Sequence, residues 1–114
     1  MNTLIILNDP PYGTERSYHG LRLAKALNKT DAKVTVFLLA DAVVCAKRGQ
    51  KVPQGFYNIE LMLKSILRKD EVLLCGACMD ARGFTDDDIV QDARRSTMAE
   101  LAERTLTSDK VLVF

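Results

Sequence analysis

Two of the three cysteines stand three residues apart in the stretch VLLCGACMDARG, residues 72–83, where an apolar run passes into a loop. A thiol acts as a nucleophile through its thiolate, which is favoured at a helix amino terminus or beside a cation. If the residues after Cys75 turn into a helix, their free amides point toward its sulfur, and Arg82 supplies positive charge from the same loop. Cys75 is therefore the leading candidate for a reactive thiol, with Cys78 and Arg82 as its partners.

The spacing of Cys75 and Cys78 admits four interpretations. They could be two small apolar residues of the core. Zinc needs about four ligands, and the chain adds only the distant Cys45 and His19, so no metal site is expected. A thioredoxin-like dithiol fits a pair that follows a strand, although this pair comes late in the chain and no tryptophan accompanies it. In the fourth interpretation, one thiolate accepts a sulfane sulfur and passes it on.

The elements that must position these thiols alternate along the chain. Short apolar, β-branched runs predict strands at residues 3–7, 33–40, 71–75 and 110–114. Apolar residues at helical spacing predict helices at 14–27, at 59–66 after the cap Asn58, and at 98–105 after a capping box of Thr97 and Glu100, with a shorter helix from Asp41. Residues 84–96 show no clear pattern.

Strands that alternate with helices need crossover connections. The sequence therefore predicts one domain over residues 1–114, with a three-layer α/β fold of the flavodoxin-like or Rossmann-like kind: a mainly parallel sheet with helices on both faces. Ligands and chemistry collect beyond the carboxyl ends of such strands. The loops expected there are residues 8–13, 41–49 and 75–83, which makes Tyr12, Asp41 and Gly83 candidate cleft residues beside the thiols. Asp80 is expected to cap a helix or to pair with Arg82.

Composition excludes several classes of function. The formal charge is +1, from 16 basic and 15 acidic residues, so no nucleic-acid partner is expected. The first loop, NDPPYGTERS, matches no phosphate-binding motif, so no nucleotide or other cofactor is expected. The amino terminus does not resemble a secretion signal, and no apolar run reaches the roughly 20 residues of a membrane helix. We expect a cytoplasmic protein with reduced thiols and no membrane partner.

Apolar residues outside the predicted core favour self-association. The final residues, VLVF, would make a poor solvated edge strand. Leu61, Leu67 and the GFY of the loop at 48–57 lie outside the main helical stripes and could seal subunit contacts. A homo-oligomer is therefore expected.

Several segments, taken together, resemble a known family over the whole chain. They are NDPPYGTERSYHGLRLAKAL, FLLADAV, RGQK, GFYNIELML, LCGACMDARG and LAERTLTSDKVLVF. In order and spacing they resemble the DsrE/DsrF/TusD-like family, and within it most of all the small YchN-type proteins. The resemblance implies a three-layer α/β domain that assembles into dimers, trimers or hexamers. It also implies that Cys75, by its position before RG, is the cysteine that becomes a persulfide in the sulfur-relay members.

Three functional hypotheses remain open at this stage. The leading one is a sulfur-relay protein or sulfurtransferase that carries sulfane sulfur on Cys75 between a donor and an acceptor protein. The second is a thiol-disulfide oxidoreductase that uses Cys75 and Cys78 together. The third is a non-catalytic oligomeric binding or scaffold protein in which both cysteines serve packing. A pure carrier should hold its second thiol away from the persulfide, because a neighbouring thiol could attack it and release sulfide.

Overall fold

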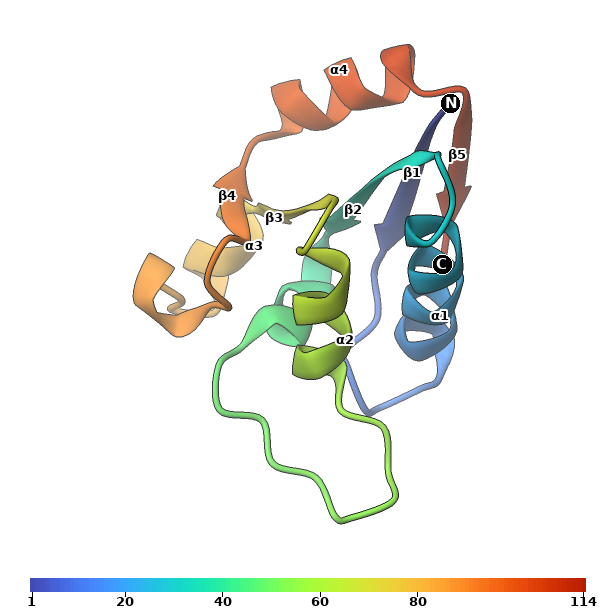
Figure 1. The fold of residues 1–114 in the computed structure, drawn as a ribbon. Coiled ribbons are helices and arrows are strands. Elements are labelled where there is room, and N and C mark those ends of the chain that lie inside the picture. Colours follow the sequence, from blue (N-terminus) through green and yellow to red (C-terminus); the bar gives the residue numbers. More distant parts are fainter.

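The computed structural model describes residues 1–114 as five strands and their connecting helices (Figure 1). In chain order the elements are β1 (Asn2–Leu7), α1 (Arg16–Asn28), β2 (Lys33–Leu38), the 3₁₀ helix η1 (Ala40–Ala46), α2 (Ile59–Ile66), β3 (Glu71–Cys75), α3 (Gly76–Ala81), the 3₁₀ helix η2 (Asp86–Asp88), β4 (Arg94–Ser96), α4 (Met98–Thr107) and β5 (Lys110–Val113). The strands form one sheet in the order β4-β3-β2-β1-β5, and every neighbouring pair is parallel. The predicted parallel α/β fold is confirmed.

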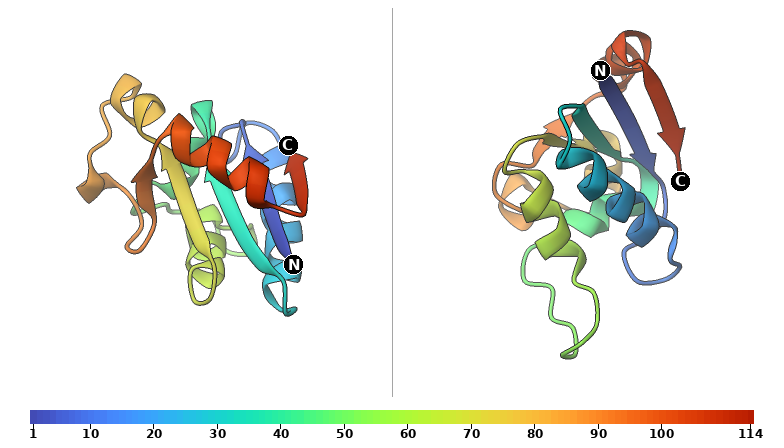
Figure 2. Two further views of the ribbon diagram at one scale, coloured as in Figure 1. Left: turned by 90° about the horizontal axis from the view of Figure 1, so that it is seen from above. Right: turned by 45° about the vertical axis from the view of Figure 1, so that its right-hand side comes forward.

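The two faces of the sheet are covered unequally. Side chains alternate between the faces along each strand. One face packs against α1 and α2 and, with η1, encloses a cluster of 19 buried apolar residues. The other face carries α4 alone and a cluster of only five: Leu4, Phe37, Leu73, Cys75 and Leu101. Figure 2 shows α4 on the opposite side of the sheet from α1 and α2, which completes the three layers.

Local sequence explains how the main helices begin and how closely they pack. The Asn58 side chain accepts a hydrogen bond from the Leu61 amide at 3.1 Å, and the Thr97 hydroxyl accepts one from the Glu100 amide at 3.1 Å. Asn58 and Thr97 therefore cap their helices as predicted, but the Glu100 side chain does not complete the capping box and binds Arg94 instead. Helix α1 lies so close to β1 that a Cβ at Gly20 would collide with the Leu7 side chain.

Three elements differ from the sequence prediction. Strand β2 ends at Leu38, not at residue 40, and the segment after it is a 3₁₀ helix that starts at Ala40. Strand β4 lies inside residues 84–96, where the sequence shows no strand pattern. The pattern is missing because the first two residues of β4 are exposed arginines and only Ser96 is buried.

None of the helices is both long enough and apolar enough to cross a membrane.

Candidate functional site

The thiol pair lies at the carboxyl end of β3, where the strand passes directly into α3. Cys75 is the last residue of β3 and the N-cap of α3, which begins at Gly76. A Cβ at Gly76 would lie 2.9 Å from Nε of Arg95 and 3.0 Å from the carbonyl oxygen of Ser96, both from β4. Only glycine allows β4 to approach this turn so closely, and the approach brings Arg95 beside the first turn of α3.

The two thiols differ in their exposure to solvent. Cys75 is 6% exposed and belongs to the smaller apolar cluster, on the face that carries α4. Cys78 is half-buried and packs against both apolar clusters. Both are free thiols. The pair thus lies where the core reaches the surface, with Cys78 as its outer member.

The sulfur of Cys78 accepts a hydrogen bond from the backbone. The amide of Ala40, in the segment that follows β2, donates to Sγ of Cys78 at 3.2 Å. Ala40 adopts a φ of 52°, a left-handed conformation that alanine rarely takes. Burial and the neighbouring Cys75 thiol raise the pKa of Cys78, while the Ala40 amide and Arg82 act in the opposite direction.

Two arginines flank the thiol pair, and each is held by a carboxylate. Nη2 of Arg82 lies 2.6 Å from Oδ1 of Asp41, and Nη1 donates to the Cys78 carbonyl at 3.0 Å. The hydrogen bond to Asp41 raises the pKa of Arg82, and the nearby Cys78 and Cys75 sulfurs make smaller electrostatic contributions. The structure thus brings together Cys75, Cys78, Arg82 and Asp41 at the carboxyl ends of β2 and β3.

Arg95 is the neighbour of the thiols that the sequence did not identify. Its Nη2 lies 2.6 Å from Oδ2 of Asp80, so the expected pairing of Asp80 with Arg82 is wrong. The hydrogen bond to Asp80 raises the pKa of Arg95, with a smaller contribution from the sulfur of Cys75. Arg95 reaches α3 only because β4 pairs with β3, and no local pattern in residues 84–96 signalled that strand.

The other two candidate cleft residues have structural surroundings of their own. The Tyr12 hydroxyl donates to Oε1 of Gln50 at 2.5 Å and accepts from the Ile59 amide at 3.1 Å, while its ring stacks on Tyr57. Gly83 follows the end of α3 with a φ of +70°, in a position where a Cβ would meet open space. Tyr12 therefore secures the start of α2, and Gly83 allows the chain to turn away from α3.

The third thiol lies in the larger cluster, on the face that α1 and α2 cover. Cys45 is completely buried, and burial raises its pKa to about 12. A thiol in that state is a poor nucleophile. No group of three or more histidine, cysteine, aspartate or glutamate side chains comes together as metal ligands would.

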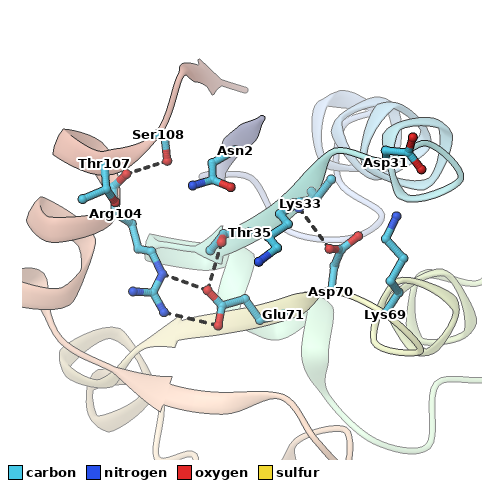
Figure 3. Close-up of a pocket in the computed structure, with 11 residues that line it drawn as sticks. Asn2, Asp31, Lys33, Thr35, Lys69, Asp70, Glu71, Arg104, Thr107 and Ser108 are labelled. Atoms are coloured by element: carbon cyan, nitrogen blue, oxygen red, sulfur yellow. Dashed lines mark hydrogen bonds and ion pairs between the residues drawn. The ribbon is translucent and has the colours of Figure 1, made fainter.

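A hollow lies at the end of the sheet opposite the thiols, at the amino ends of β1, β2 and β3 (Figure 3). It is an open hollow of about 800 Å³ with mostly polar and charged walls. Arg104 binds Glu71 with two hydrogen bonds of 2.8 and 3.3 Å, and Thr35 donates to the same carboxylate at 2.9 Å. Asp70 accepts hydrogen bonds from the Val34 amide and from Asn28. The carboxylates of Glu71 and Asp70 are thus already engaged in joining the elements.

Comparisons with known proteins agree over the whole chain. A model of the DsrE/DsrF-like family matches residues 1–114. The YchN protein of Escherichia coli strain K12 is 40% identical in an alignment of 114 positions, which covers 97% of each chain. An uncharacterised protein of Methanocaldococcus jannaschii is 33% identical over 114 residues, which cover 100% of both chains.

Solved structures match the fold as well. The crystal structure of YchN from Escherichia coli has a TM-score of 0.93 at 39% identity, over 99% of this chain and 98% of that chain. A protein of unknown function from Methanobacterium thermoautotrophicum has a TM-score of 0.80 at 10% identity, over 99% and 98% of the two chains. The second match concerns the fold alone.

Proposed function

The chain belongs to the DsrE/DsrF-like family, and from this premise we propose that it accepts and transfers sulfane sulfur as a persulfide on Cys75. The observation that carries the proposal is the position of Cys75 between the end of β3 and the start of α3, within electrostatic reach of Arg82 and Arg95. Guanidinium groups beside a sulfur stabilise the anions that form during sulfur transfer.

The reaction has two steps, and the thiolate of Cys75 is restored at the end. In the first step, this thiolate attacks the outer sulfur of a donor persulfide, and the donor thiolate leaves with the electron pair of the broken S–S bond. In the second step, an acceptor thiolate attacks the outer sulfur on Cys75, whose own thiolate then leaves. Arg82, Arg95 and the free amides at the start of α3 stabilise the anions in both steps.

Mass spectrometry of the purified protein tests this function. The test uses the Cys78→Ser variant, which lacks the second thiol of the pair. After incubation with a small-molecule persulfide, we expect it to gain one sulfur atom that maps to Cys75. Adding Cys75→Ser should abolish the gain, and adding Cys45→Ser should leave it unchanged because Cys45 is buried on the other face. Absence of added sulfur on Cys75, under conditions that load a known carrier, would contradict the proposal.

A thiol-disulfide oxidoreductase is a second candidate, favoured by the position of Cys78 beside Cys75. An oxidoreductase needs both thiols, whereas a carrier needs one. The Cys78→Ser variant separates the two functions, since it retains an oxygen acceptor for the Ala40 amide. Loss of disulfide exchange with retained loading of Cys75 is the expected result.

We also propose that the chain forms a homo-oligomer through the face that α4 only partly covers, with a trimer or hexamer as the expected assembly. Leu106 on α4 is 86% exposed and Val113 on β5 is 65% exposed. Val113 pairs with Ile6 in register, so the two side chains share the face of the smaller cluster. An exposed apolar area of this kind favours burial against a second copy of the chain.

Light scattering at micromolar concentration measures the assembly. We expect a mass above that of the monomer for the wild type and a clear decrease for Leu106→Asp. Leu61→Asp, on α2 and 59% exposed, compares the opposite face and should change the mass less. A monomeric wild type would rule out the assembly.

A further inference from the structure

Cys78 faces Cys75 from the first turn of α3. Cys75 is the N-cap residue of this helix, so Cys78 occupies the third helical position. The side chain of an N-cap residue lies beside the third residue of its helix, which is why these two positions exchange hydrogen bonds in capping boxes. Cys78 also packs on the apolar cluster that contains Cys75. The second thiol is therefore not turned away from the first, as a pure carrier would require.

Two neighbouring groups stabilise negative charge at the sulfur of Cys78, against the burial and the Cys75 thiol that raise its pKa. The Ala40 amide donates to Sγ at 3.2 Å, and Arg82 binds the Cys78 carbonyl at 3.0 Å, which keeps a cation beside α3. Ala40, which donates this hydrogen bond, holds a left-handed conformation. A strained backbone of this kind persists only where the surrounding structure holds it, and it clusters at functional sites.

From this geometry we propose that Cys78 resolves the Cys75 persulfide and releases its outer sulfur as sulfide, so that the protein reduces sulfane sulfur. The inference rests on the proposed loading of Cys75. The thiolate of Cys78 attacks the inner sulfur, which is Sγ of Cys75. The bond between the two persulfide sulfurs breaks, and hydrosulfide leaves with its electron pair. A Cys75–Cys78 disulfide forms, so the two protein thiols are oxidised while the sulfane sulfur is reduced.

Attack on the inner sulfur is favoured over attack on the outer one by the group that leaves. Hydrogen sulfide is a stronger acid than an alkyl thiol. Its anion, hydrosulfide, is therefore the better leaving group, because thiols of lower pKa leave faster. Attack on the outer sulfur would instead move that sulfur to Cys78 and leave Cys75 as a thiolate, with no release of sulfide.

The substrates are persulfides of small thiols or of protein cysteines, and a thiol reductant completes the cycle. Two monothiols, or one dithiol, reduce the Cys75–Cys78 disulfide by exchange and regenerate both thiols. Each turnover then converts one persulfide and two reducing equivalents into one donor thiol and one sulfide.

A single-turnover experiment tests the inference. The reduced full-length protein is freed of reductant, mixed with glutathione persulfide and assayed for sulfide and for the mass of the chain. We expect the wild type and Cys45→Ser to release sulfide and to gain a Cys75–Cys78 disulfide. Cys78→Ser should accumulate the Cys75 persulfide and release sulfide at least about tenfold more slowly. Circular dichroism confirms that each variant is folded.

The possible failures are distinguishable. If Cys78→Ser carries no sulfur on Cys75, the proposed function fails and the inference fails with it. If the wild type holds a stable Cys75 persulfide without sulfide release, only the inference fails. The same holds if the sulfur accumulates on Cys78, since Cys78 would then have attacked the outer atom.

Discussion

Ion pairs lie at both ends of the sheet, but only those at the carboxyl end flank thiols. At the amino end, the hollow of about 800 Å³ is lined by charged side chains that bond to one another, as Arg104 and Glu71 do. At the carboxyl end, the thiol pair lies at the edge of the apolar core, and Arg82 and Arg95 stand beside it. The hollow at the amino end therefore joins secondary-structure elements, while the carboxyl end holds the thiols of the proposed sulfur transfer. In this molecule, the volume of a hollow is a poorer guide to the proposed chemistry than the kind of side chain present.

The ion pairs and hydrogen bonds of α4 have a clear mechanical role. Glu100 on α4 binds Arg94 on β4 at 2.7 Å, and it also accepts from Ser96. Arg104, one turn further along α4, binds Glu71 on β3 at 2.8 Å. These bonds attach the only helix on its face to two strands. At the carboxyl end, the ion pairs of Arg82 with Asp41 and of Arg95 with Asp80 flank the thiols instead. Variants of Arg104 and of these two arginines should therefore separate stability from reactivity.

The largest difference is expected from Cys75→Ser at the carboxyl end. It removes the thiol proposed to carry sulfur, so uptake of sulfur from the donor persulfide should fall to background, at least about a hundredfold below wild type. Serine keeps the size of cysteine but places a hydroxyl among apolar side chains, so the unfolding temperature should fall by only about a few degrees. A variant that unfolds at a much lower temperature would show that Cys75 acts through packing instead.

The next largest effect is expected from replacing both Arg82 and Arg95 with alanine. Arg82 lowers the pKa of Cys78, and both cations stabilise negative charge beside the pair, so alkylation by iodoacetamide at neutral pH should slow by about tenfold without them. Arg68→Ala serves as the control, because it removes an exposed arginine that follows the end of α2. An unchanged alkylation rate in the double variant would show that the arginines do not activate the site.

Arg104→Ala tests the opposite end and should change stability alone. It breaks the two hydrogen bonds to Glu71, and the free energy of unfolding should fall by about 1 to 2 kcal/mol. Denaturant titration measures this loss. Cys75 should load with sulfur at the wild-type rate in buffer without denaturant; a slower rate would mean that the two ends are coupled.

The smallest effect concerns the pH dependence of stability. Hydrogen bonds from Arg94 and Ser96 lower the pKa of Glu100 to about 2. The unfolded chain has a glutamate pKa of about 4.3, so the contribution of this carboxylate is fully present above that pH and is lost as the pH falls toward 2. Glu100→Gln should therefore cost about 1 kcal/mol near pH 6 and less near pH 2.5. A cost that does not change with pH would place the effect outside the ionised group.

Periodic patterns allowed most of the fold to be predicted. The apolar stripe of residues 59–66 and the caps Asn58 and Thr97 are local signals, and they appear in the structure as expected. Cys75 at the end of a strand could also be read from the sequence, because an apolar run stops there.

The missing parts of the site depend on contacts between distant segments. Arg95 reaches the thiols through the pairing of β4 with β3, and a three-residue edge strand that begins with two arginines leaves no apolar pattern. The amide of Ala40 reaches Cys78 through a left-handed turn at an alanine, a residue type that does not announce such a turn. The predicted pairing of Asp80 with Arg82 is wrong for the same reason. Arg82 is nearer to Asp80 in sequence, but Arg95 is nearer in space.

The position of β1 between β2 and β5 has a consequence for synthesis of the chain. β1 pairs with β5, and the Asn8 amide binds the Phe114 carbonyl at 3.1 Å across 106 residues of sequence. A ribosome adds roughly 5 to 20 residues per second, so one edge of β1 waits on the order of ten seconds for its partner. Strands that are free to pair do so in microseconds. Throughout this interval the nascent protein presents an open, apolar strand edge, and it is then most in need of a chaperone.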